Sequence, residues 1–174
     1  MRAIYRMALA AFLGFALTVG MASHVIAQQQ TKSVMQQLVG TWQLVYAITT
    51  LSDGTKREGF GGNTQGIFML DGKGNFSIQL MGDARRKFAS NSRLQGTPDE
   101  NKGVAMGSIA YYGTLSIEDA TNTVTLHVVR NSFSNWDGTD QKRIITKLAG
   151  DDLTWSDPAT SMGGASVNVW KRAN

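Results

Sequence analysis

The sequence predicts an all-β domain of eight short antiparallel strands, and three observations support this. Eight segments of alternating or β-branched residues follow one another along the chain. Turn-forming residues separate them, and the Asp-Gly-Lys-Gly-Asn run at 71–75 is the clearest hairpin signal. The 174 residues are 42% hydrophobic and contain no internal repeat or linker, which suits one packed domain. The expected strands cover residues 41–46, 65–70, 75–81, 108–117, 123–130, 140–148, 151–156 and 166–171.

Eight such strands form either a β-sandwich or an up-and-down barrel. We favour the barrel, because it leaves no strand edge exposed and encloses room for one small ligand. A Ser-x-x-Gln capping box predicts a short N-terminal helix over residues 33–39. The Thr-Pro-Asp-Glu run at 97–100 predicts a second helix over 98–106. That helix lies in a long polar insertion, residues 82–106, which we interpret as a lid over the open end of the barrel.

The first 27 residues have the pattern of a secretory signal peptide. Arg2 and Arg6 precede an uncharged apolar run over residues 7–22, and cleavage is expected after Ala27. The alternative is an uncleaved anchor, but the run is shorter than the roughly 20 residues that span a bilayer. We therefore expect a signal peptide at 1–27, a single domain at 28–174, and an exported protein, periplasmic or secreted, without a stable membrane anchor.

The charge balance of the mature chain argues against nucleic acid as a partner. Removing Arg2 and Arg6 from 17 basic residues leaves 15 against 13 acidic ones, a net charge of +2. The one basic cluster, at 85–87, is typical of a solvated loop and not of a nucleic-acid-binding stripe. The chain has no cysteine, which excludes disulfides, thiolate zinc sites, iron–sulfur clusters and thiol nucleophiles. We predict no cofactor and no metal, because His127 is the single histidine after signal cleavage.

A set of motifs in order along the chain resembles a known family. The pieces include Leu-Val-Gly-Thr-Trp-Gln-Leu-Val at 38–45, the stretch 66–74, Ile-Ala-Tyr-Tyr-Gly-Thr at 109–114 and Asn-Trp-Asp-Gly at 135–138. Together they resemble the bacterial and fungal lipocalin-like domain family, within the calycin barrels, over residues 38–172. The resemblance implies an eight-stranded antiparallel up-and-down lipocalin-like barrel that encloses a cavity. It also implies that Trp42 packs beneath the barrel against Lys171 or Arg172.

Several polar residues on the predicted strands are candidates for ligand binding. His127 could orient a polar ligand or move a proton, or it could be a structural or solvent-facing histidine. Gln141 and Arg143 share one face of their strand. If that face lines the barrel, Arg143 needs a partner, which a ligand carboxylate, Asp137 or an aspartate at 140 could supply. The alternative is an outward-facing charge, but a Gln-x-Arg pair with a histidine recurs in the resembling family and favours an inward cluster.

Aromatic residues complete the predicted ligand-binding set. Tyr111 and Tyr112 point to opposite faces of their strand, so one of them enters the interior. A buried tyrosine hydroxyl needs a hydrogen-bond partner, which the neighbouring strands could provide. Trp136 is interpreted as a packing or rim residue. The predicted ligand-binding residues are therefore His127, Arg143, Gln141, Tyr111, Tyr112 and Trp136, and no catalytic residue is assigned.

The function that these features favour is the binding of a small, mainly apolar molecule with a polar or acidic end. Small-molecule sites are mostly apolar with a few convergent polar groups, and barrel mouths often hold them. One alternative is a cavity enzyme of the isomerase or cyclase type, using acid–base chemistry from His127 or a tyrosine. Another is an envelope module that binds other proteins through its outer surface. A binding protein is favoured over an enzyme, because the fold alone implies a cavity and not a reaction.

Overall fold

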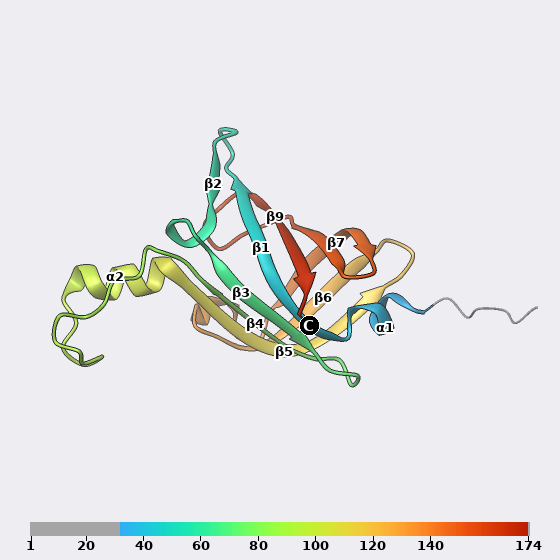
Figure 1. Ribbon diagram of the computed structural model, residues 1–174, viewed down its shortest axis with the longest axis horizontal. Helices are drawn as coiled ribbons and strands as arrows, with labels where there is room; N and C mark the ends of the chain where they lie inside the picture. Colours follow the sequence, from blue (N-terminus) through green and yellow to red (C-terminus); the bar gives the residue numbers. More distant parts are fainter. Residues whose placement is uncertain (1–31, 174) are drawn as a thin grey trace, which may run out of the picture. The chain divides into compact units, whose positions relative to one another are not determined.

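The computed structural model describes residues 32–173, so the predicted signal segment 1–27 lies outside the described residues. Within that range, nine strands form one antiparallel sheet in the order β2-β1-β3-β4-β5-β6-β7-β8-β9, and β1 also pairs with β9. This last pairing closes a barrel of eight strands, which confirms the barrel over the sandwich (Figure 1). The strands are β1 (Gly40–Thr50), β2 (Lys56–Glu58), β3 (Gln65–Leu70), β4 (Asn75–Met81), β5 (Ser108–Glu118), β6 (Thr123–Asn131), β7 (Asp140–Ala149), β8 (Asp152–Asp157) and β9 (Ala165–Arg172).

The eight predicted strands are all present, and β2 is the one that the sequence pattern does not reveal. It has three residues, all charged and exposed, and it pairs with the last residues of β1, along the edge whose first residues pair with β3. The predicted turn at 71–75 joins β3 to β4. The carboxylate of Asp71 accepts hydrogen bonds from the backbone N–H groups of Lys73 and Asn75, each at 2.8 Å. Gly74 supplies the positive φ of 85° that this turn needs.

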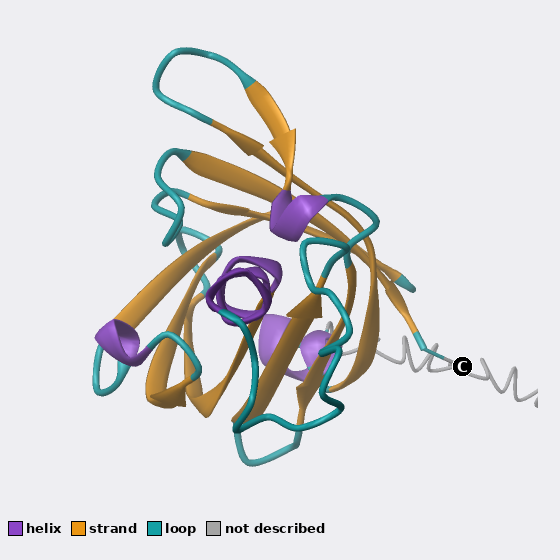
Figure 2. Cartoon of the chain, turned by 90° about the vertical axis from the view of Figure 1, so that its left-hand side faces the viewer, coloured by secondary structure: helices purple, strands orange, loops and turns teal. Residues whose placement is uncertain are grey.

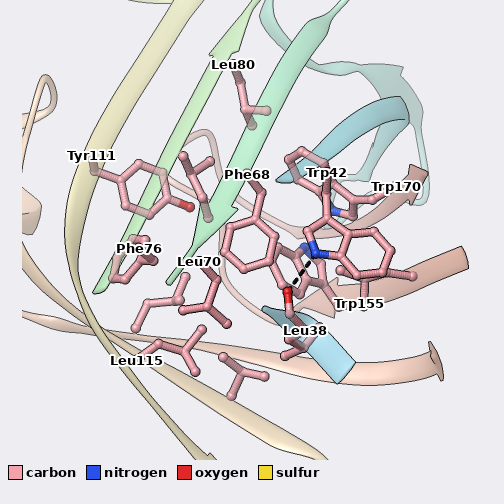
Figure 3. Close-up of a cluster of buried hydrophobic side chains, with 14 of the residues drawn as sticks. Leu38, Trp42, Phe68, Leu70, Phe76, Leu80, Tyr111, Leu115, Trp155 and Trp170 are labelled. Carbon is pink, nitrogen blue, oxygen red and sulfur yellow. Dashed lines mark hydrogen bonds between the residues drawn. The ribbon is translucent and has the colours of Figure 1, made fainter. Parts of the chain in front are cut away.

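A short helix and a buried tryptophan close one end of the barrel. Helix α1 (Val34–Leu38) begins with the predicted capping box, in which Ser33 and Gln36 exchange side-chain and backbone hydrogen bonds. Trp42, at the start of β1, is fully buried, and its Nε1 donates to the carbonyl of Leu38 at 2.8 Å (Figure 3). This hydrogen bond holds the helix against the base of the barrel.

The basic residue expected beside Trp42 is Arg172 and not Lys171. The guanidinium carbon of Arg172 lies 4.2 Å from the centroid of the Trp42 ring, which is a cation–π geometry. The same side chain donates to the carbonyl oxygens of Val39 at 2.9 Å and Gln37 at 2.6 Å. Lys171 has the opposite parity on β9 and pairs outside the barrel.

Above this closed end, the inward-facing side chains form one hydrophobic core. Phe68 packs against Trp155 and Trp170, with ring centroids 5.0 and 6.1 Å apart, and the two tryptophans lie 5.6 Å apart (Figure 3). The branched aliphatic residues of β6, including Val124 and Leu126, fill the opposite wall. The barrel is therefore tightly packed at the α1 end, and open space remains only toward the other end of the described domain.

The insertion after β4 carries the predicted second helix, α2 (Pro98–Gly107). Thr97 caps it, Pro98 opens it, and Glu100 returns a hydrogen bond to the backbone N–H of Thr97 at 2.8 Å. Figure 2 views the ring of strands from the end at which α2 lies, with the helix seen end-on. Within residues 32–173, every helix is too short or too polar to cross a lipid bilayer.

Candidate functional site

The open end of the barrel contains a pocket with mainly apolar walls. Ile78 and Leu80 of β4 and Ile109 of β5 line it, while Phe60 and Met162 come from loops at the mouth. The cavity volume of the pocket is about 50 Å³, and the pocket opens to solvent at its mouth. A dry cavity of about 150 Å³ accommodates benzene. The enclosed part therefore fits a group of a few heavy atoms, with the rest of a ligand reaching into the mouth.

A buried polar cluster centred on Arg143 lies at the wall of this pocket. The side chain of Arg143 is 4% exposed, and its Nη1 lies 3.1 Å from Oδ1 of Asp157, whose side chain is 9% exposed. Arg143 Nη1 also donates to the carbonyl of Lys142 at 2.7 Å, and Nη2 donates to the hydroxyl oxygen of Tyr111 at 3.2 Å. The arginine is thus inward-facing, and Asp157 is its partner, in place of the ligand carboxylate or the aspartates at 137 and 140.

Burial controls the protonation of this cluster. It raises the pKa of the Asp157 carboxyl. The charge of Arg143 and the hydrogen bond from the backbone N–H of Ala159 lower that pKa and so oppose the effect of burial. Burial also raises the pKa of the Tyr111 hydroxyl, and the charge of Arg143 opposes that shift. Tyr111 therefore keeps its proton at neutral pH. Because its oxygen already accepts from Arg143, its O–H is the group that can be offered to a ligand.

Aromatic rings hold Tyr111 in place. Figure 3 shows its ring directed inward from β5 beside Phe76, and the two ring centroids are 5.8 Å apart. On another side, Trp136 packs edge-on against it at 5.9 Å, and Trp136 itself rests on Phe133 at 6.2 Å. Edge-to-face packing of this kind favours one ring orientation. Trp136 is half-buried and lines the pocket, in keeping with its interpretation as a rim residue.

A second group of polar side chains lines the pocket from β1 and β9. Thr49, Ser166 and Asn168 are all buried, and Asn168 Nδ2 donates to Ser166 Oγ at 3.3 Å. Trp170, two residues further along β9, is 1% exposed and also lines the pocket. Its Nε1 is buried and finds no acceptor among residues 32–173. A buried donor without a partner costs free energy, which a bound acceptor would offset.

Three of the six predicted residues do not line the pocket. His127 lies on the outer face of β6, opposite the buried Val124, Leu126 and Val128. Tyr112 also points outward and is 52% exposed. Gln141 shares the inward parity of Arg143, but it is only half-buried and donates to Thr139 Oγ1 at 2.9 Å at the strand end. The expected inward cluster of histidine, glutamine and arginine is therefore wrong for the histidine, because the alternation of β6 turns it to the outside.

Asp157, Ser166 and Asn168 are pocket residues that the sequence reasoning missed. The sequence pattern contained a signal for them, because alternate residues of a strand share one face. Asp157 shares its face with Trp155, and Ser166 and Asn168 share theirs with Trp170. A buried tryptophan two or four positions away on the same strand therefore marks these polar residues as inward-facing.

The predicted lid does not cover the pocket. The insertion containing α2 contacts the mouth through η1 (Gly59–Gly61), and Gly82 donates to the carbonyl of Gly107 at 2.9 Å. None of the described residues 82–107 lines the pocket. In Figure 1, α2 extends away from the strands instead of folding back over them.

The described domain matches one family profile and has distant likenesses among solved structures. A redesigned β-barrel is 15% identical, covering 82% of this chain and 100% of that chain, with a TM-score of 0.42. A de novo designed fluorescence-activating β-barrel is 13% identical, covering 82% of this chain and 99% of that chain, with a TM-score of 0.44. No curated protein matches the chain. The profile of the lipocalin-like domain matches residues 39–173, which span the whole barrel. The chain therefore belongs to the lipocalin-like domain family.

Proposed function

We propose that this protein binds a small, mainly apolar molecule in the open end of its barrel, with the polar end of the molecule on Tyr111 and Arg143. One observation carries the proposal: an ordered, buried polar cluster lies in the wall of an otherwise apolar pocket. Pockets of this composition are typical of small-molecule sites. We also propose that the protein is exported to the periplasm or secreted, on the basis of the pattern in residues 1–27.

The charge balance of the pocket favours a neutral polar end over an acidic one. Asp157 already forms an ion pair with Arg143, so a ligand carboxylate would bring a second negative charge close to that of Asp157. A ligand hydroxyl, carbonyl or amide can accept from Tyr111 without this repulsion. The preferred ligand is therefore an apolar body with a neutral hydrogen-bonding group, instead of the acid that the sequence left open.

The pocket supports binding better than acid–base catalysis. His127, the histidine of the described domain, lies on the outer face and cannot reach a ligand inside the barrel. Tyr111 would have to act as the base of a cavity enzyme. Its raised pKa makes it a donor at neutral pH and a poor base.

A matched pair of small aromatic ligands tests the proposal. Phenol and benzoate share one ring but differ in the charge of the polar end. We expect phenol to shift the methyl NMR signals of the pocket residues Ile78 and Ile109, while benzoate does so only weakly. Ile144, on the outer face of β7, is the internal control and should not shift with either ligand.

A cavity-filling variant identifies the site of any shift. Ala47 is buried and lines the pocket, so Ala47→Met places about three additional heavy atoms there. Ala149→Met adds the same atoms on the exposed end of β7. The phenol response should disappear in the first variant and persist in the second. Equal responses in both variants would place the binding outside the pocket and contradict the proposal.

A further inference from the structure

The outer face of the barrel carries a serine, a histidine and an aspartate in one hydrogen-bonded chain. Ser116 lies on β5, His127 on β6 and Asp140 at the start of β7. Ser116 Oγ is 3.0 Å from His127 Nε2, and His127 Nδ1 is 2.6 Å from Asp140 Oδ1. All three side chains point away from the pocket, so this cluster is separate from the ligand site proposed above.

The connectivity within the cluster determines which nitrogen carries the proton. The carboxylate of Asp140 accepts a hydrogen bond, so it selects the tautomer of His127 with hydrogen on Nδ1. Nε2 is then an acceptor, and the hydroxyl of Ser116 donates to it. This is the arrangement in which an imidazole can remove the proton of a serine hydroxyl as the oxygen attacks a carbonyl carbon.

The strand register places a hydroxyl beside Ser116 and an ammonium one strand further along the same face. Ser116 is directly opposite Thr125 on β6, and Thr125 is opposite Lys142 on β7. Directly opposed side chains on antiparallel strands have Cβ atoms about 5 Å apart. The hydroxyl of Thr125 and the ammonium of Lys142 therefore share a face with Ser116. Thr125 can donate to an oxyanion that develops on an acyl group attached to Ser116, and Lys142 adds a positive charge to that face.

We propose that Ser116 is a nucleophile that accepts acyl groups from small activated esters, with His127 as its general base and Asp140 as a positioning residue. Ser116 Oγ forms a bond to the carbonyl carbon and passes its proton to His127 Nε2. The ester C–O bond then breaks, and the leaving oxygen either takes that proton or departs as a phenolate while His127 releases the proton to the surrounding water. Water, deprotonated by His127, subsequently attacks the acyl-serine, releases the carboxylic acid and restores the hydroxyl.

The exposure of the site defines the substrate class. The side chains of His127 and Asp140 are 44% and 59% exposed, so the cluster has no deep pocket for a long acyl chain. Short acyl groups with good leaving groups, such as acetyl aryl esters, therefore fit best. Water around the site weakens electrostatic stabilisation, so we expect a slower reaction than a buried triad supports.

p-Nitrophenyl acetate is the probe for this activity. We expect the full chain to release p-nitrophenolate and to carry a single acetyl group on Ser116, located by peptide mass spectrometry after rapid acid quenching. Ser116→Ala and His127→Gln should each lower the protein-dependent rate by at least about 10-fold. The double variant should be no slower than either single variant, because the two residues act as a unit. Ser77→Ala, on the outer face of β4, is the matched control and should keep the full rate.

Asp140→Asn tests the positioning role separately. It should shift the imidazole nitrogen NMR signals of His127 toward the other tautomer and lower the rate without removing Ser116. The three residues are surface-exposed, so unchanged circular dichroism spectra are expected for every variant. An unchanged rate in Ser116→Ala, or acetyl groups on His127 or Lys142 instead of Ser116, would overturn the proposal.

Discussion

Arg143 and Asp157 form an ion pair inside the barrel, with 3.1 Å between Nη1 and Oδ1 and both side chains at least nine-tenths buried. They come from β7 and from the end of β8, and Ile144 pairs with Ser156 one position away. Removing two charges from water is costly, and a buried pair often contributes little net stability. The pair is therefore weak evidence for stability, and its place in the pocket wall is in keeping with the binding role proposed above.

Breaking this pair from one side should be strongly destabilising. Arg143→Leu leaves Asp157 buried without its counter-charge, and we expect a loss of about 3 kcal/mol in the free energy of unfolding at about pH 7. Burial raises the pKa of Asp157, and removing Arg143 takes away the positive charge that opposes this shift. The contribution of Asp157 to the stability of the variant is therefore fully present below the unfolded pKa of 3.8 and is lost as pH rises through the folded value.

Urea unfolding of two variants checks this prediction. Arg143→Leu should lose less stability at about pH 4 than at about pH 7. Arg143→Leu/Asp157→Leu should recover part of the loss at the higher pH, because no unpaired charge remains inside. A double variant as unstable as the single one would contradict the electrostatic explanation.

Asp152 should affect stability in the opposite pH direction. Hydrogen bonds from Lys171 and Lys147, at 2.7 and 3.0 Å, lower the pKa of its carboxyl from 3.8 to about 2. A lowered folded pKa contributes stability that is present above 3.8 and is lost as pH falls through about 2. Asp152→Asn should therefore lose less thermal stability than the wild type as the pH is lowered below 3.8, measured by thermal unfolding. Asp119→Asn, in the exposed turn after β5, is the control and should lose stability as the wild type does.

The contact between Arg172 and Trp42 should stabilise the closed end of the barrel. Arg172→Met removes the cation–π contact and two hydrogen bonds to backbone carbonyls, for an expected loss of about 2 kcal/mol in urea unfolding. Arg172→Lys should not restore it, because an ammonium lacks the planar fork that reaches both carbonyls. Arg130→Met removes a 70% exposed arginine in a surface ion pair and should change stability by less than about 0.5 kcal/mol. Equal effects of the Arg172 and Arg130 variants would contradict this account.

The strands and the two helices could be predicted from the sequence, because alternation, capping boxes and glycine turns are local signals. The packing of Trp42 beneath the barrel followed from the resemblance to the family. The pocket could be predicted only in part. Arg143 is buried because Asp157 lies beside it on the neighbouring strand, and the pattern of one strand does not reveal a partner on another. Tyr111 and Tyr112 could be assigned to opposite faces, but not to a specific one, without the register.

His127 shows how a polar residue can mislead. Its strand alternates Val-Leu-Val on one face with Thr-Thr-His on the other, and this pattern alone indicates an outward histidine. The resemblance to the family favoured an inward cluster instead. The structure resolves the conflict through strand parity and reveals the contacts with Ser116 and Asp140, which lie 11 and 13 residues away in sequence.

Native mass spectrometry of the protein purified from its own source can detect a ligand bound in the pocket. We expect a discrete small-molecule adduct near one per chain on the wild type and on Ala149→Met, and its absence from Ala47→Met, in which the pocket is filled. Denaturation should release a neutral, mainly apolar compound. An adduct that is equally abundant on Ala47→Met would contradict binding in this pocket. So would a wild-type protein that carries no adduct and whose pocket methyl signals do not shift with phenol.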